Sequence, residues 1–222
     1  MERRLGTQHE MSAVPVDYLI STLVTLFVVV DPVGLVPTFV AITHGLPRPT
    51  RRQIAIRASL IAAAILIGTA AVGDWLLTRL GISLPAFRIA GGLLLFSIAS
   101  EMVFGVRIER QSRTAEQAVE DLRHIAAFPL AIPLMAGPGA ITATVLLAAQ
   151  ADGRPLFLFV LIGMILVVIG LCLVIFLLAI RIGPLLGITA NVVLSRLLGV
   201  LLAALAVQFV IDGIRAVLSA AP

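Results

Sequence analysis

The feature that most constrains this chain is an apolar run, Tyr18–Ile42, interrupted near its centre by residues that a membrane-spanning helix normally avoids. A spanning helix needs roughly 20 consecutive apolar residues, and this run is long enough. Its middle nevertheless reads Asp31-Pro32-Val33-Gly34, with Pro37 following within one turn. Proline removes an intrahelical hydrogen bond and clashes with the preceding turn, and a carboxylate at that depth usually marks a function. We therefore predict a broken transmembrane helix.

The composition indicates a membrane protein. Of the 222 residues, 60% are hydrophobic and 13% are charged, and the mean hydropathy is +1.12. Soluble domains average about 25% charged residues. All sixteen basic residues are arginine. They form no basic run with interleaved aromatics, so we read them as topology signals rather than as a nucleic-acid surface.

Six apolar segments follow one another along the chain, each near the length of a spanning helix. They are Asp17–Thr43, Ile54–Gly73, Pro85–Phe104, Ala126–Ala149, Pro155–Ile180 and Arg196–Leu218. None shows period-2 alternation, so strands are not expected. We predict an all-α membrane protein with six transmembrane helices in a single domain, residues 1–222, with a polar cytoplasmic loop at about 105–125.

Arginine counts near the segment ends predict the orientation, because cytoplasmic loops carry the excess of basic residues. The first, third and fifth connections hold nine arginines, and the second and fourth connections with the C-terminus hold three. Adding Arg3 and Arg4 to the second group makes it five. We expect the odd-numbered loops in the cytoplasm and both termini outside, in a multi-pass protein of the cell (inner) membrane.

The two halves of the chain resemble each other. Leu80-Gly81-Ile82-Ser83 matches Leu186-Gly187-Ile188-Thr189, Pro32 matches Pro138 at the same offset, and a third match joins the segments that begin at Arg88 and Arg196. Repeats at about 17–105 and 123–218 would each hold three spans. An odd number of spans forces opposite orientations, which is the inverted-repeat plan of many secondary transporters.

The second half has its own interruption, Gly137-Pro138-Gly139, within the fourth apolar segment. Both interruptions lie about twelve or thirteen residues into their segments, near the centre of a hydrocarbon layer about 30 Å thick. Proline suits the first position of a helix and Asp is a strong N-cap, so Asp31-Pro32 and Gly137-Pro138 are each expected to start a second half-helix. Glycine offers no cap, which would leave open N–H donors at Gly139.

A negative side chain in one break and bare donors in the other suit a zwitterion. We predict that a small amino acid binds there, with its carboxylate at Gly139–Thr142 and its ammonium near Asp31. Asp31 could alternatively, or also, carry a coupling proton. The expected binding residues are Asp31, Pro32, Gly34, Pro37, Thr38, Gly137, Pro138, Gly139 and Thr142. The competing interpretation is structural, in which Asp31 caps a kink and the prolines bend helices.

Other polar residues carry weaker signals. Arg88 and Arg196 begin spans and are best read as reaching the membrane interface. Gln208 lies deeper and could line a path or bond another helix. The single cysteine, Cys172, has no disulfide partner and reads as a packed side chain. The histidines (His9, His44 and His124) show no metal-ligand spacing, so neither a metal nor another cofactor is expected.

Two long motifs, Asp31-Pro32-Val33-Gly34-Leu35-Val36-Pro37-Thr38-Phe39 and Ile132-Pro133-Leu134-Met135-Ala136-Gly137-Pro138-Gly139-Ala140-Ile141-Thr142, resemble the signatures of the MarC family. These are the multiple-antibiotic-resistance-related inner-membrane proteins also called UPF0056. The resemblance covers nearly the whole chain. It implies six spans, kinship with the lysine exporter superfamily and, in some members, transport of glycine or alanine.

Of the functions considered, the sequence best supports a secondary transporter of small neutral amino acids. Its expected partners are the lipid bilayer and a small zwitterionic solute, and a homo-oligomer is left open. The alternative is a non-transporting scaffold or stress factor in the membrane. An enzyme is not expected, because only Asp31 is clearly at the midplane. A phosphate-loop pump is disfavoured because the chain has no lysine. A channel would also use half-helices but would conduct without saturating.

Overall fold

The computed structural model describes residues 15–106, 134–150, 154–182 and 188–220. Within these residues the chain forms seven α-helices and no strand. The helices are α1 (Val16–Val30), α2 (Val36–Ile42), α3 (Arg48–Arg79), α4 (Leu84–Phe104), α6 (Pro138–Ala149), α7 (Pro155–Ile182) and α8 (Ile188–Ala220). Most of the polar loop expected at 105–125, and the start of the fourth apolar segment, lie outside the described residues.

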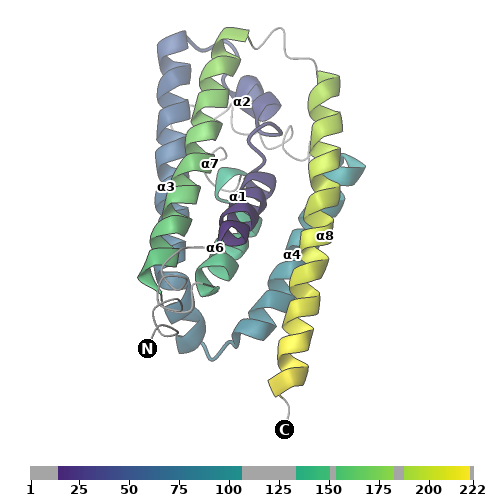
Figure 1. Ribbon diagram of the computed structural model, residues 1–222. Helices are drawn as coiled ribbons and strands as arrows, with labels where there is room; N and C mark the ends of the chain where they lie inside the picture. The colour runs from purple at the N-terminus through teal and green to yellow at the C-terminus, as the bar shows by residue number, and fades with distance from the viewer. Residues whose placement is uncertain (1–14, 107–133, 151–153, 183–187, 221–222) are drawn as a thin grey trace, which may run out of the picture.

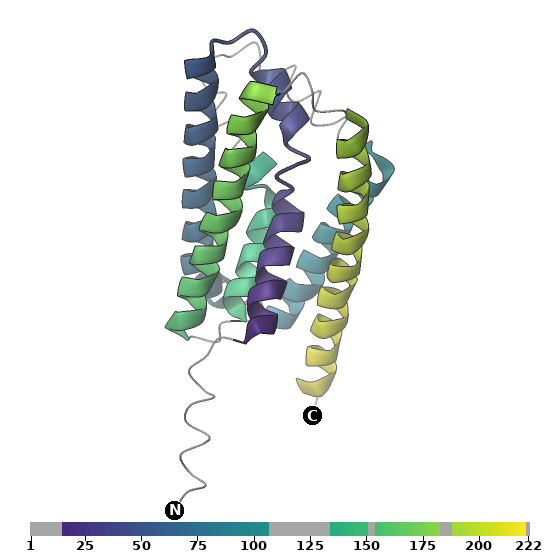
Figure 2. The same ribbon diagram turned by 45° about the horizontal axis from the view of Figure 1, so that its top comes forward.

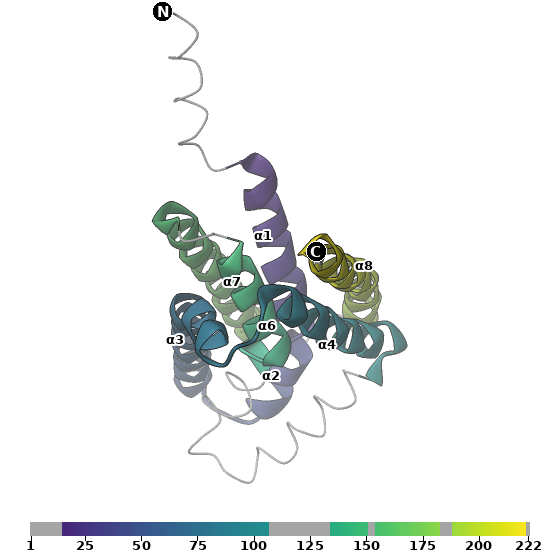
Figure 3. The same cartoon turned by 90° about the horizontal axis from the view of Figure 1, so that it is seen from below.

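The helices form two long pairs with shorter helices between them. α3 packs against α7, and α4 packs against α8. Figure 1 shows α1, α2 and α6 between the two pairs, and Figure 3 shows the same order from below. α1 contacts α6, α7 and α8, and α6 also contacts α3 and α4. The short helices therefore lie between the long ones. α1 exposes one face, but residues 28–31 at its broken end are buried.

Four helices are long and apolar enough to cross a membrane, namely Arg48–Arg79, Leu84–Phe104, Pro155–Arg181 and Val193–Ser219. They correspond to the second, third, fifth and sixth predicted segments, and the expectation of an all-helical protein is confirmed for the described residues. Two shorter apolar helices, Tyr18–Val30 and Pro138–Ala149, belong to the two interrupted segments. Neither reaches the roughly 20 residues that a single straight span requires.

The boundaries predicted for two segments were too narrow. α3 begins at Arg48 rather than Ile54 and continues to Arg79, and α8 begins before Arg196. Hydropathy locates only the apolar part of a helix. The residues added to α3 include Arg48, Arg51, Arg52 and Arg79, and because arginine is a good helix former this helix continues beyond its apolar stretch.

The outward faces of the helices are apolar. Large exposed side chains include Leu93 on α4, Val174 and Leu178 on α7, and Leu197 and Val200 on α8. Exposed apolar surface on this scale is what a lipid-facing helix presents. At the end of the bundle where α1 begins, Tyr18 meets Phe157 with their ring centroids 4.9 Å apart, and Arg154 lies over Phe157. Aromatic and basic side chains of this kind are typical of a membrane interface.

Glycines bring α4 and α8 into backbone contact. A β-carbon at Gly92 would lie 2.6 Å from the carbonyl oxygen of Ala206, one at Gly199 would lie 3.1 Å from that of Ala99, and one at Gly213 would lie 2.9 Å from that of Pro85. These three sites are spread along the length of the antiparallel pair. Small residues at membrane helix interfaces permit this close approach, and it lets dispersion forces act over the whole seam.

We expect Gly92→Ala to lower the stability of the protein by about 1–3 kcal/mol, because the added methyl group meets backbone atoms of α8 that cannot move aside. Thermal unfolding in detergent measures the effect. Gly163→Ala and Gly170→Ala on α7 are matched controls, since no neighbour lies within 4 Å of a β-carbon there. Those changes should leave the melting temperature unchanged or raise it slightly. An equal loss in all three variants would contradict the close packing of α4 on α8.

Candidate functional site

The first break is organised by Asp31. Its backbone N–H donates to the carbonyl oxygen of Phe27 at 2.9 Å and so ends α1. The residue adopts a left-handed conformation, with φ 53° and ψ 65°, and is the only non-glycine residue with positive φ among those described. Its carbonyl oxygen accepts from Leu35 at 3.1 Å, and its side-chain Oδ1 accepts from the N–H of Gly34 at 3.0 Å. One buried residue therefore satisfies backbone groups on both sides of the turn.

The prediction that Asp31 caps the start of the second half-helix was wrong in its position. Asp31 is the C-cap of α1, and α2 starts only at Val36, with Leu35 as its N-cap and Pro37 in its first turn. Asp is among the few side chains that tolerate the left-handed region, so it can end one helix while its carboxylate bonds the N–H three residues later. The carboxylate does accept a backbone N–H, that of Gly34, but this N–H belongs to the turn between the helices and not to α2.

The Asp31 side chain leaves room only for glycine at position 34. A β-carbon there would collide with the carboxylate of Asp31. Any larger residue would displace the side chain from the position in which it accepts the Gly34 N–H. The Asp31–Gly34 pair is thus a single structural unit, and the pattern Asp-Pro-x-Gly in the sequence follows from it.

The second break starts as the sequence predicted. Gly137 is the N-cap of α6, Pro138 occupies the first turn, and no side chain among the described residues caps this end. The Ile141 N–H donates to the Gly137 carbonyl oxygen at 3.0 Å, which begins the helical ladder. Because Pro138 has no N–H, the backbone donors of this first turn are those of Gly139 and Ala140. The positive end of the α6 dipole lies at these residues, and Gly139 and Ala140 are both buried.

The fold brings the two breaks together. A β-carbon at Gly139 would lie 3.4 Å from Cγ1 of Val29, the residue two before Asp31. Figures 1 and 2 show the end of α1 and the start of α6 at about the same height in the bundle. Towards the other end of the two helices, the hydroxyl group of Tyr18 donates to the carbonyl oxygen of Leu147 at 3.4 Å. α1 and α6 are therefore antiparallel neighbours, with the C-terminal end of one beside the N-terminal end of the other.

The remaining predicted site residues are near these ends but differ in exposure. Pro32, Gly34, Thr38, Gly137 and Gly139 are buried, as is Thr142. Pro37 is half-buried and Pro138 is exposed. The methyl group of Thr142 points at α4, because a β-carbon at Gly91 would lie 2.5 Å from its Cγ2. Thr142 therefore serves at least in part to seat α6 on α4.

The interpretation of Cys172 as a packed side chain is confirmed, because on α7 it is fully buried; it also lies within electrostatic reach of Asp31. Other buried polar groups were missed by sequence reasoning. In the part of the chain that the structure describes, the hydroxyl groups of Thr25, Ser59 and Thr144 are buried and lack a hydrogen-bond partner. A buried polar group without a partner costs about 1–3 kcal/mol. The sequence held a signal for α1, because Thr22 and Thr25 are three residues apart and therefore lie on the same face of a helix.

The other polar candidates have local explanations. The Arg196 side chain lies over Gly105, the C-cap of α4, where a cation complements the negative end of a helix. Gln208 donates to Asp212 at 2.8 Å on its own helix, so it does not bridge helices. His9 and His124 are outside the described residues, and His44 lies exposed after α2. Among the described residues, no group of three or more His, Cys, Asp or Glu could hold a metal ion.

We expect Asp31→Asn to leave the stability within about 0.5 kcal/mol of the parent, because the amide oxygen still accepts the Gly34 N–H and Asn tolerates positive φ. Asp31→Ala should cost about 1–3 kcal/mol, since it removes the acceptor and leaves the N–H unpaired. Thermal unfolding in detergent distinguishes the two. Gly34→Ala should resemble Asp31→Ala, whereas Gly68→Ala, at a site with open space, should not. Equal effects of Asn and Ala at position 31 would contradict the capping role.

The apolar spanning helices and the enclosed broken ones define a polytopic α-helical integral membrane protein. The family model described as MarC family integral membrane protein matches residues 16–218, and the chain belongs to this family. It is 38% identical to a UPF0056 membrane protein of Methanocaldococcus jannaschii, over 90% of this chain and 98% of that one. It is 35% identical to the UPF0056 membrane protein YhcE of Escherichia coli, over 86% and 89%. No solved structure matches it.

Proposed function

We propose that this protein is a secondary transporter of small neutral amino acids and not an enzyme. The observation that carries the proposal is the meeting of the two breaks inside the bundle. The C-terminal end of α1, with the Asp31 carboxylate, lies beside the uncapped N-terminal end of α6. Discontinuous helices of this kind form the central substrate sites of many secondary transporters.

The charges at the breaks suit a zwitterion. The last carbonyl groups of α1 and the carboxylate of Asp31 favour the ammonium group of an amino acid, and the N–H groups of Gly139 and Ala140 favour its carboxylate. Because these groups lie on adjoining helix ends, we propose that one small zwitterion contacts both of them. Val29, Leu95 and Ile98 pack closely on Gly139, so a solute that reaches the N–H groups of α6 has to be small.

Asp31 is expected to contribute more to substrate binding than the end of α6 does. A helix end contributes up to about 2 kcal/mol to binding a charge in a partly buried site. Two unit charges 4 Å apart interact by about 4 kcal/mol at an effective dielectric constant of 20. Removing the charge of Asp31 should therefore weaken binding more than perturbing the end of α6. Asp31 is also the residue that we propose for proton coupling, because it is the titratable group within the break.

The packing of the long helices supports the inverted repeat on which this mechanism depends. α3 packs on α7 and α4 packs on α8, and the proposed repeat makes each of these a pair of equivalent helices. In addition, α2 packs on α7 as α6 packs on α3. Phe39 stacks on Phe176 with their ring centroids 4.6 Å apart at the first of these contacts. In an inverted repeat, such pairs can tilt relative to the central helices and expose the breaks to either side in turn.

The positions of the arginines support the proposed orientation. Arg48, Arg51, Arg52 and Arg181 gather at the end of the bundle where α2 leads into α3, and Arg79 and Arg154 lie at the opposite end, where α1 begins. Figure 2 shows the beginning of α1 and the end of α8 at the same, lower end of the bundle. We propose that the arginine-rich end faces the cytoplasm of a cell with an inner membrane and that both termini face outwards.

Reporter fusions test this orientation. A periplasmic alkaline phosphatase fused after Ser219 should be active, and a fluorescent protein that matures only in the cytoplasm should be dark at the same site. The same two reporters inserted at Gly45, between α2 and α3, should give the opposite result. Reversal of both pairs of signals would overturn the proposed topology without affecting the proposed substrate.

Counterflow in proteoliposomes tests the function. Vesicles loaded with unlabelled glycine or alanine should accumulate the labelled amino acid with saturable kinetics, which a channel would not show. Asp31→Asn should lower the uptake efficiency at least about 100-fold, as expected for losing most of a charge interaction of about 4 kcal/mol. Gly139→Ala should lower it less, because the methyl group meets only the flexible tip of Ile98 while crowding the end of α6.

The control for these variants is Thr69→Val on α3, which removes a hydroxyl group that bonds only the carbonyl of Ile65 on its own helix. It should transport like the parent. Uptake by Asp31→Asn at the parental rate and with the parental pH dependence would exclude the proposed role of Asp31. Absence of uptake by the parent across a panel of small amino acids, with a pH gradient imposed, would favour a non-transporting membrane protein instead.

A further inference from the structure

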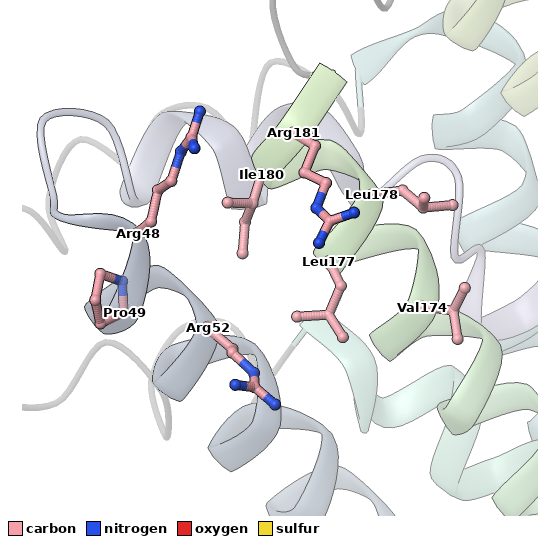
Figure 4. A pocket seen from close by; sticks show the side chains of 8 residues that line it. All are labelled: Arg48, Pro49, Arg52, Val174, Leu177, Leu178, Ile180 and Arg181. Atoms are coloured by element: carbon pink, nitrogen blue, oxygen red, sulfur yellow. The ribbon is translucent and has the colours of Figure 1, made fainter.

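Two adjoining hollows lie at the arginine-rich end of the bundle. The larger, of about 710 Å³, lies between the start of α3 and the end of α7 and is lined by Arg48, Arg52 and Arg181 together with Val174, Leu177 and Leu178. Figure 4 shows Arg48 and Arg52 of α3 opposite Ile180 and Arg181 of α7, with Val174 and Leu178 farther from α3. The smaller, of about 540 Å³, shares Arg48 and Arg181 and adds Arg51 and His44. We call the two together the basic groove.

The groove is strongly basic. Four arginines line it, and none of its lining residues, as far as the structure describes the chain, is acidic. Arg51 is held in place by a hydrogen bond of 3.2 Å from its Nε to Oγ1 of Thr43. Four like charges in one groove repel one another, so the arrangement favours an anionic occupant. Guanidinium groups bind phosphate well because their planar N–H donors match its oxygens.

The backbone adds to this preference. α3 begins at Arg48, with Pro47 as its N-cap and Pro49 in its first turn, and no side chain caps this end. The positive end of a 32-residue helix is therefore directed into the same region as the arginines. This end would not be a site by itself, but it reinforces the charge that the side chains already provide.

The other wall of the groove is apolar and continues onto the lipid-facing surface of α7. Val174 is 51% exposed and Leu178 is 48% exposed, and they lie one helical turn apart. A soluble anion would gain nothing from this wall. A phospholipid would place its phosphate among the arginines and an acyl chain along Val174 and Leu178, so that each wall of the groove meets a matching part of the molecule.

We propose that the basic groove is a binding site for an anionic phospholipid, whose phosphate contacts Arg48, Arg52 and Arg181 and whose acyl chain lies on α7. The site is separate from the breaks around Asp31, and the proposal does not depend on transport. Because α3 and α7 both pack around the central broken helices, a bound lipid would hold the ends of these two helices together.

The test is direct binding of short-chain lipids to the purified protein in a neutral detergent. Dioctanoyl phosphatidylglycerol is titrated and followed by native mass spectrometry, alongside dioctanoyl phosphatidylcholine and inorganic phosphate. Each basic side chain near a bilayer surface contributes about 1 kcal/mol to anionic lipid binding, or about fivefold in affinity. Arg52→Gln and Arg181→Gln should each weaken phosphatidylglycerol binding about fivefold, and the double variant roughly 25-fold.

Arg57→Gln is the matched control, because Arg57 is exposed on the same helix and does not line the groove. It should bind like the parent. Arg52 and Arg181 are both exposed, so their substitution should not unfold the protein. The melting temperature of each single variant establishes that it is folded. Equal affinity for phosphatidylcholine, undiminished binding in the double variant, or an equal loss in Arg57→Gln would overturn the proposal. Binding of inorganic phosphate as tight as that of phosphatidylglycerol would assign the groove to a soluble anion.

Discussion

The structure depends on how a break in a helix is accommodated where no water is available to bond the freed backbone groups. In hydrocarbon each unsatisfied N–H or carbonyl group costs several kcal/mol, so an interrupted helix persists only if protein atoms replace the missing bonds. Asp31 does this with its N–H, its carbonyl oxygen and its carboxylate, and Gly34 leaves the space that the carboxylate needs. The cost of a left-handed Asp, of order 1–3 kcal/mol, is balanced by those bonds.

The surrounding helices isolate this element. The paired helices α3–α7 and α4–α8 present apolar faces outwards and small residues inwards, and glycines along α4 and α8 allow backbone contact. The interior they leave is narrow and is filled by α1, α2 and α6. Buried polar groups such as Ser59, Thr25 and Thr144 lie on helices that border these three or belong to them. These few hydroxyl groups lie among apolar side chains, and polar groups within membrane helices typically face the interior of the bundle as these do.

The sequence was sufficient for features that depend on local chemistry. Proline after glycine located the start of α6, and Asp31 with Gly34 located the first break, because these residues act through their own backbone. The sequence was insufficient where tertiary geometry decides. Predicting the left-handed conformation of Asp31 would require knowing whether it ends the first helix or begins the second. The approach of Val29 to Gly139 depends on how α1 packs on α6. The extent of α3 was underestimated because its arginines are helical yet not apolar.

The basic groove has a chemical property that follows from the chain having arginine and no lysine. A guanidinium group keeps its proton throughout the physiological range, and lysine acetylation is not available to neutralise it. The charge of its four arginines is therefore constant across growth conditions. What varies around them is the supply of anions and the ionic strength, so the membrane's lipid composition, rather than lysine-type modification, would set how often the groove is filled.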